Sequence, residues 1–174
     1  MKNKILSFAA ILLFHLGTSG AVEAQVESVQ VRVDGLACPF CAYGLEKKLK
    51  RIEGVGGVKI NVDKGVATLQ NKKEHSIAVE RLEEVVKKAG FTPREVSTTV
   101  VGKVGQKDGT WVLWTDHSEV QFILKVDEEF KKLRAKLQGS EGLVRITGHL
   151  VHETPEGHHA HPFTLRIEKF EVLK

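Results

Sequence analysis

Residues 27–96 switch repeatedly between two hydrophobic periods, and this switching restricts the possible folds more than any other feature of the chain. Apolar residues alternate with polar ones where a strand is expected, and they recur every three or four residues where a helix is expected. The six elements are expected near residues 29–34, 40–52, 55–62, 66–69, 76–89 and 93–96. Their order is strand, helix, strand, strand, helix, strand.

Turn and capping residues mark the ends of these elements. Gly54 stands just past the first expected helix and Gly90 just past the second, and glycine commonly ends a helix at that position. Residues 63–65 (Asp-Lys-Gly) form a turn between the two middle strands, which predicts a hairpin. Ser76 is expected to cap the second helix. The complete order is that of a ferredoxin-like split βαβ unit.

The only two cysteines, Cys38 and Cys41, lie between the first strand and the first helix. At a helix N-terminus the dipole and the free N–H groups favour an anion, so a thiolate forms more easily there. Such a pair can bind a soft metal ion or work as a dithiol–disulfide couple. A purely structural disulfide is disfavoured, because closing so short a loop constrains the unfolded chain little. The residues themselves leave metal binding and redox chemistry open.

Four segments around these cysteines match one known family. They are Gly35–Cys41, Leu45–Leu49, Gly54–Val58 and Ala89–Phe91. Together they make Val29–Val96 resemble the heavy-metal-associated domain, a family of copper chaperones, amino-terminal domains of metal-pumping ATPases and the periplasmic mercuric-ion binding protein. The resemblance implies that Cys38 and Cys41 are metal ligands and that Phe91 lies near the metal loop. It also implies a metal transporter, or an acceptor protein with a cysteine-containing site, as the partner.

Two departures from the family pattern bear on the choice of metal. The family usually has Met then Thr before the first cysteine, whereas this chain has Leu36, which can fill the same buried place, and Ala37. Zinc-binding members often have an acidic residue beside the first cysteine. Because Ala37 offers none, the site is expected to prefer Cu(I) or Hg(II) to Zn(II). Pro39 suits the first turn of a helix. A proline between two cysteines also resembles thioredoxin-like oxidoreductases, but the hairpin directly after the first helix argues against the thioredoxin order.

Residues 98–174 are expected to form a second unit. Its strands are expected at 98–104, 110–115, 120–126, 143–152 and 163–173, with a helix at 128–137 capped by Asp127. This is the order of a small five-stranded OB-like β-barrel. Trp111 and Trp114 differ by three positions on a strand, so one side chain is expected in the core and the other at the surface. The predicted fold class is α+β: a ferredoxin-like βαββαβ domain over residues 25–97, whose last strand runs into the OB-like barrel.

Histidines concentrate near the carboxyl end of the chain. Two of them, His149 and His152, fall on an expected strand, and His158, His159 and His161 fall in the loop that follows it. Imidazole suits copper, zinc and nickel, and short His-rich tracts often bind metal, although a polar exposed loop has the same composition. The three loop histidines are therefore expected to form a secondary metal site at most. The remaining candidates, His75 and His117, are expected to be ordinary surface residues.

Residues 1–24 have the pattern of a secretory signal. Lys2 and Lys4 precede an apolar run at residues 5–16, and small residues precede an expected cut after Ala24. The run is shorter than the roughly 20 residues of a transmembrane helix. We therefore expect a periplasmic or otherwise exported protein. The formal net charge of +4, with acids and bases interspersed, does not suggest nucleic-acid binding, and membrane contact is expected only through a partner.

Three functions from different classes fit this sequence. No serine nucleophile motif, phosphate-binding glycine loop or carboxylate pair is visible, so a role other than catalysis is favoured. The leading hypothesis is an exported protein that holds and transfers Cu(I) or Hg(II) between Cys38 and Cys41. The alternatives are a thiol–disulfide oxidoreductase with Cys38 as nucleophile, and a binding module in which the barrel recognises a partner. Cys38 is expected to be the more exposed and the more acidic thiol.

Overall fold

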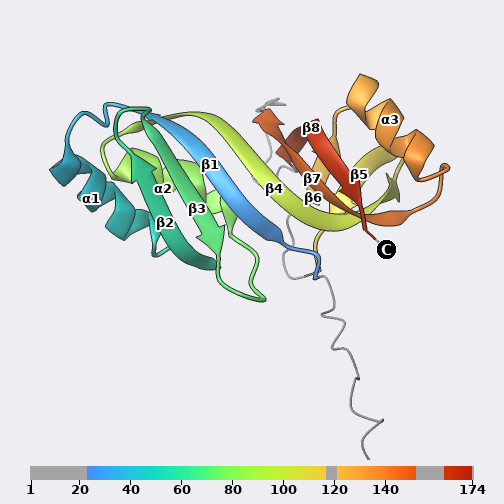
Figure 1. The fold of residues 1–174 in the computed structure, drawn as a ribbon, viewed down its shortest axis with the longest axis horizontal. Helices are drawn as coiled ribbons and strands as arrows, with labels where there is room; N and C mark the ends of the chain where they lie inside the picture. Colours follow the sequence, from blue (N-terminus) through green and yellow to red (C-terminus); the bar gives the residue numbers. More distant parts are fainter. Residues whose placement is uncertain (1–22, 117–120, 152–162, 174) are drawn as a thin grey trace, which may run out of the picture.

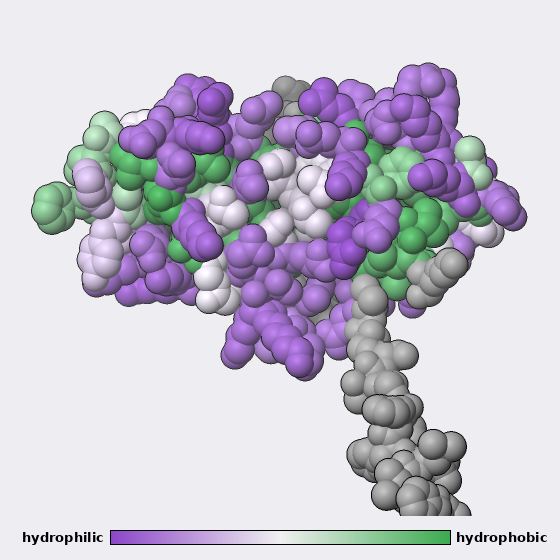
Figure 2. All heavy atoms as spheres, in the orientation of Figure 1, coloured by the Kyte–Doolittle hydropathy of each residue, from purple (hydrophilic) through white to green (hydrophobic). Residues whose placement is uncertain are grey.

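The computed structural model describes residues 23–116, 121–151 and 163–173. In chain order its elements are β1 (Val26–Asp34), α1 (Pro39–Leu49), β2 (Val55–Asn61), β3 (Val66–Asn71), the 3₁₀ turn η1 (Val79–Arg81), α2 (Leu82–Lys88), β4 (Thr92–Lys107), β5 (Thr110–Trp114), β6 (Gln121–Leu124), α3 (Glu128–Lys136), β7 (Gly142–Val151) and β8 (Phe163–Val172) (Figure 1). Hydrophilic side chains cover most of the face seen in Figure 2. Within the described ranges no helix is both long and apolar enough to cross a bilayer.

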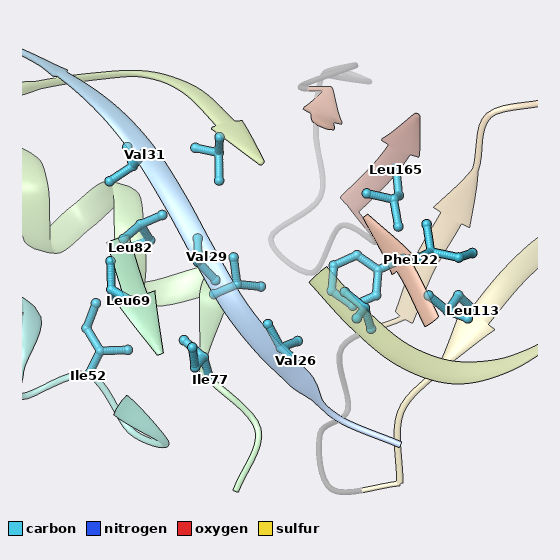
Figure 3. Packing of buried hydrophobic residues seen from close by; sticks show 14 of the residues in the cluster. Val26, Val29, Val31, Ile52, Leu69, Ile77, Leu82, Leu113, Phe122 and Leu165 are labelled. Atoms are coloured by element: carbon cyan, nitrogen blue, oxygen red, sulfur yellow. The ribbon is translucent and has the colours of Figure 1, made fainter. Parts of the chain in front are cut away.

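The amino-terminal half has the expected ferredoxin-like arrangement. Its strands lie in the order β2-β3-β1-β4, all antiparallel, and α1 and α2 contact each other and the sheet. Leu45 and Leu49 of α1 are fully buried, as is Val86 of α2. Figure 3 shows Leu69, Ile77 and other apolar side chains gathered beside β1. Burying each such side chain contributes about 1.5–3 kcal/mol, so this core holds the loop between β1 and α1 in place.

The second helix begins later than the sequence predicts. The Ser76 hydroxyl does not cap it, because that oxygen accepts a hydrogen bond from the Val26 N–H at 3.0 Å. The chain then passes through η1, and α2 begins at Leu82 without a side-chain cap. Gly54 lies against the same segment, with a φ of +78°, and a Cβ there would stand 1.9 Å from the Ser76 carbonyl oxygen. Ser76 thus forms a hydrogen bond with the start of β1 and does not cap a helix.

A single strand, β4, belongs to both halves of the molecule. It has 16 residues, pairing with β1 from Thr92 to Val100, with β7 from Val96 to Val104 and with β5 from Lys103 to Lys107. The expectation that the two predicted strands run together is confirmed. The predicted domain boundary between residues 97 and 98 falls inside this strand, where both edges are paired. Separate folding of residues 25–97 and 98–174 stays a prediction.

The carboxyl-terminal half is rich in β structure, and its five strands form a ring. The strands pair in the order β4-β5-β6-β8-β7, and β7 pairs back onto β4. As predicted, Asp127 caps α3, accepting the Phe130 N–H at 3.1 Å. Both tryptophans are half-buried: the Trp111 ring lies 5.4 Å from the Phe130 ring and packs against the core, and Trp114 lies over Gly105. The expected division into one core and one surface tryptophan is therefore not found.

Residues from β1 and from the segment before it hold the two halves together. Ala24 is fully buried, and its carbonyl oxygen accepts the Asp116 N–H at 2.9 Å. On the other side Arg145 of β7 donates two hydrogen bonds to the Glu27 carboxylate, at 3.0 and 3.1 Å, and one to Glu171 at 3.0 Å. A cut directly after Ala24, as the sequence pattern suggests, would remove a core side chain and a hydrogen-bond acceptor.

Candidate metal centre

The loop that carries the cysteines is fixed at both ends. At its start Gly35 has a φ of +85°, which turns the chain away from β1, and Leu36 is 5% exposed and fills the buried place expected for it. At its end Cys38 is the N-cap residue of α1, with extended backbone angles, and Pro39 opens the helix. Proline is favoured there because it lacks the N–H that a first helical turn leaves unpaired. The loop thus presents Cys38 and Cys41 at the helix N-terminus.

The two sulfur atoms lie together and are free thiols. The distance from Cys38 Sγ to Cys41 Sγ is 2.6 Å, and the Cys41 backbone N–H donates to Cys38 Sγ at 3.2 Å. Cys38 is half-buried and Cys41 is exposed. The expectation that Cys38 is the more exposed thiol is therefore wrong. The physical reason is the capping position: the side chain of Cys38 turns back over the helix end to accept the N–H, while that of Cys41 faces outward.

The acidity of the two thiols differs in the expected direction. Hydrogen bonds from the side chain and then the backbone of Cys41 lower the pKa of Cys38. The hydrogen bond to Cys38 is the main cause that raises the pKa of Cys41. Partial removal of the Cys41 sulfur from water raises it further, and so does the negative charge of Cys38. One proton shared between the sulfurs accounts for both shifts. Cys38 is the thiol that ionises first, and Cys41 holds the remaining proton.

An aromatic side chain and a paired carboxylate stand at the start of the cysteine loop. Phe91 lies beside the loop, its Cδ1 atom 3.7 Å from where a Cβ on Gly35 would stand. The carboxylate of Asp34, the last residue of β1, is engaged by Arg94, with Nε 2.6 Å from Oδ2. Over the described parts of the chain, no group of three or more His, Cys, Asp or Glu side chains is arranged to hold a metal ion. A soft ion with two sulfur ligands is the chemistry that this pair can support.

Comparison with known proteins identifies the half that carries this site. Residues 30–92 match the model of a family described as the heavy-metal-associated domain. These residues form a heavy-metal-associated domain. The domain is 35% identical over 66 residues to the copper-exporting P-type ATPase of Bacillus subtilis (strain 168), a match that spans 37% of this chain and 8% of that protein. The ring of five strands lies outside the matched residues.

Solved structures resembling this heavy-metal-associated domain include two copper proteins. The CopZ metallochaperone is 22% identical, with 38% of this chain and 98% of that chain covered and a TM-score of 0.36. The yeast copper transporter domain Ccc2a is 19% identical, with 39% of this chain and 92% of that chain covered and a TM-score of 0.35.

The structure describes only some of the histidines considered as a secondary metal site. His158, His159 and His161 lie outside the described residues, as do His152 and His117. His149 of β7 is described: its Nε2 lies 3.4 Å from a Glu168 carboxylate oxygen, and its Nδ1 is buried without a hydrogen-bond partner. His75 is exposed and contacts the Lys73 carbonyl at 2.8 Å, as expected for a surface residue.

Two side chains beside the cysteines carry no role in the sequence-based prediction. Phe40 and Tyr43 are expected only as part of a helix, yet they are exposed side chains of α1. A signal was available, because the buried stripe of this helix runs through Ala42, Leu45 and Leu49. Phe40 is off that stripe, and an aromatic residue away from the apolar face of a helix invites a reason other than core packing.

Proposed function

We propose that this protein binds one soft metal ion, Cu(I) or Hg(II), between Cys38 and Cys41 and passes it to an acceptor protein. The observation that carries the proposal is the pair of free thiols at the α1 N-terminus, with one sulfur exposed and the other more acidic than usual. A thiolate is the ligand form of cysteine, and soft thiolates select soft ions. The proposed chemistry is binding and transfer without catalysis.

Binding an ion requires the two sulfurs to separate. Metal–sulfur bonds of about 2.3 Å place the sulfurs of a linear S–metal–S unit about 4.6 Å apart, against 2.6 Å here. The exposed side chain of Cys41 is free to rotate outward by the required distance of about 2 Å. Cys38 can stay in its capping position, where the helix N-terminus stabilises its negative charge.

The choice between soft ions and Zn(II) is proposed from what stands beside Cys38. Ala37 supplies neither a hydroxyl nor a carboxylate, and the neighbouring Asp34 is already paired with Arg94. Zn(II) requires four ligands in most structural sites, whereas two thiolates suit a low-coordinate soft ion. Weak Zn(II) binding is expected, and Ala37→Asp should increase it.

Export and the role of the ring complete the proposal. The basic and apolar start of the chain supports export to the periplasm or a comparable compartment. The pairing order of the ring, with a helix between its third and fourth strands, supports an OB-like barrel that docks a partner or holds a secondary metal site. The loop with His158, His159 and His161 is the proposed place for that second, weaker site.

An anaerobic titration tests the metal site. Reduced full-length protein is titrated with Cu(I) against a chelator of known affinity, with native mass spectrometry for stoichiometry. One tightly bound equivalent is expected, lost in Cys38→Ser and Cys41→Ser and retained when His158, His159 and His161 are changed together to Ala. Zn(II) binding as tight as Cu(I) binding would refute the selectivity, and loss of the first equivalent in the histidine variant would refute the separation of the two sites.

A thiol–disulfide oxidoreductase is the second candidate, and one observation favours it. The sulfurs are adjacent, and the lowered pKa of Cys38 is what an attacking thiol needs. In that case Cys38 would attack a substrate disulfide, Cys41 would displace the product thiol, and the enzyme would become oxidised as the substrate is reduced. A catalysed insulin-reduction rate well above that of free dithiol, lost in Cys38→Ser, would support this function over metal transfer.

A further inference from the structure

Ala24 and Gln25 belong to the folded protein, although they precede the first strand. Ala24 is fully buried, and Figure 1 shows that the chain leads into β1 at the junction of the two halves. The Ala24 carbonyl oxygen accepts the Asp116 N–H at 2.9 Å, and the Gln25 carbonyl oxygen accepts the Val101 N–H at 2.8 Å. Both residues therefore complete the structure of this junction.

The next residue, Val26, ties the junction to the amino-terminal half. Its N–H donates to the Ser76 hydroxyl oxygen at 3.0 Å, and its carbonyl oxygen accepts the Ile77 N–H at 3.3 Å. Val26 also pairs with Val100 of β4. Residues 24–26 thus connect β4, the chain just past β5 and the segment before η1, so a loss here affects the place where the two halves meet.

A chain cut directly after Ala24 would begin inside this junction. It would lack the buried Ala24 side chain and the oxygen that accepts the Asp116 N–H. It would also carry a charged α-ammonium group on Gln25, since an α-amino group has a pKa of about 7.7–8.0. A charge beside a fully buried position is unfavourable unless it is paired. A cut upstream of Ala24 avoids these losses.

A second cleavage motif lies three residues upstream. In Ser19-Gly20-Ala21 the last residue and the residue two positions before it are both small, as a signal-cleavage site requires. The motif that ends at Ala24 has the bulkier Val22 at the corresponding position. The upstream motif also lies closer to the apolar run at residues 5–16. The sequence therefore offers a cut that keeps the whole junction in the mature chain.

We propose that a signal peptidase cleaves this protein between Ala21 and Val22, so that the mature chain begins at Val22 and keeps Ala24. This inference rests on the proposed export. Water hydrolyses the amide bond, leaving a carboxylate on Ala21 and an α-ammonium group on Val22. Because cleavage precedes folding, the motif selects the bond, and the fold decides which product is complete.

Intact mass and amino-terminal sequencing test the position of the cut. The full-length chain is expressed with its own leader in a bacterial host that has a periplasm, and the periplasmic product is collected after a short pulse of synthesis. A product that begins at Val22 is expected. Ala21→Leu should reduce that product by about tenfold or more, because the cleavage site requires a small residue there, whereas the matched variant Ala24→Leu should leave it unchanged.

The alternative products separate this proposal from the proposed export. A periplasmic chain that begins at Gln25, with or without closure of that glutamine to pyroglutamate, would overturn the cleavage site and leave export standing. So would a Val22 product that Ala24→Leu removes and Ala21→Leu does not. An uncut chain that stays in the cytoplasm would overturn export, and this cleavage with it.

Hydrogen exchange tests the structural reason for the choice. Reduced chains that begin at Val22 and at Gln25 are compared. The Asp116 amide should exchange about tenfold faster in the Gln25 chain, because its acceptor is gone, and the Val101 amide, whose acceptor both chains keep, should change far less. Failure of the Gln25 chain to fold would support the proposal. Equal exchange at Asp116 would overturn it, since the junction would then not need Ala24.

Discussion

Replacing Gly44 by alanine should make the protein more stable, although the position is glycine in the natural sequence. Gly44 is the sixth residue of α1, and no atom lies within 4 Å of the place that an added methyl group would take, so alanine introduces no clash. Glycine in a helix interior costs about 0.8–1.0 kcal/mol relative to alanine. Gly44→Ala should therefore raise the free energy of unfolding by about 1 kcal/mol, or Tm by about 2–4 °C for a chain of this size.

The assay is thermal and denaturant unfolding of the reduced, metal-free protein, followed by circular dichroism, with hydrogen exchange of the α1 amides as a local readout. Gly148→Ala is the control for a glycine that the fold requires, because a Cβ there would stand 2.2 Å from the Arg166 carbonyl oxygen. It should lower stability by more than about 2 kcal/mol. A neutral or destabilising Gly44→Ala would refute the reasoning, since it would mean that the free protein itself needs glycine in α1.

Three more predictions concern the thiols and the junction between the halves. Cys38 should be alkylated at lower pH than Cys41, since its pKa is lowered and that of Cys41 is raised by the bond between them; initial alkylation rates of each thiol in the parent protein, resolved by peptide mass spectrometry across a pH series, check this, and equal midpoints would contradict it. Arg145→Met should cost about 1–2 kcal/mol of unfolding free energy, because it leaves the part-buried carboxylate of Glu27 without its two hydrogen bonds; a double-mutant cycle with Glu27→Gln measures the coupling, and an uncoupled pair would contradict it. A chain that starts at Gln25 should melt lower than one that starts at Ala24, because Ala24 is fully buried and accepts a hydrogen bond; equal melting temperatures would show that its contacts do not matter.

Most of the architecture is predictable from local pattern. The alternation along β1 and the stripe through Leu45 and Leu49 reflect burial on one side of a strand or helix, which depends on sequence spacing alone. Asp127 caps α3 as predicted, because a cap needs only a short side chain and an N–H three residues on. Ser76 has the same local signal, but its hydroxyl is taken by Val26, 50 positions away in the sequence. A long-range partner of this kind leaves no trace in the local pattern.

Some features of the candidate site are likewise predictable from local sequence, and others are not. The position of both sulfurs at a helix N-terminus follows from spacing, and so does the direction of the Cys38 pKa shift. Their relative exposure does not, because it depends on the rotamer by which Cys38 turns back to cap the helix. The exposure of Phe40 beside them depends on which side of α1 the sheet covers, and only the assembled core decides that.

The shared strand β4 fixes the distance between the cysteine loop and the ring of five strands. Its 16 residues, at about 3.3 Å each, make a contour length of about 50 Å, and its first residue pairs with Asp34 at the edge of the cysteine loop. Two binding sites joined by a flexible tether can search many separations, and their cooperation falls off as the tether lengthens. Here no tether exists, so a partner that touches both the cysteine loop and the ring must offer its two contacts at one fixed spacing. Under the proposed function, selectivity among acceptors can then rest on this distance as well as on chemistry.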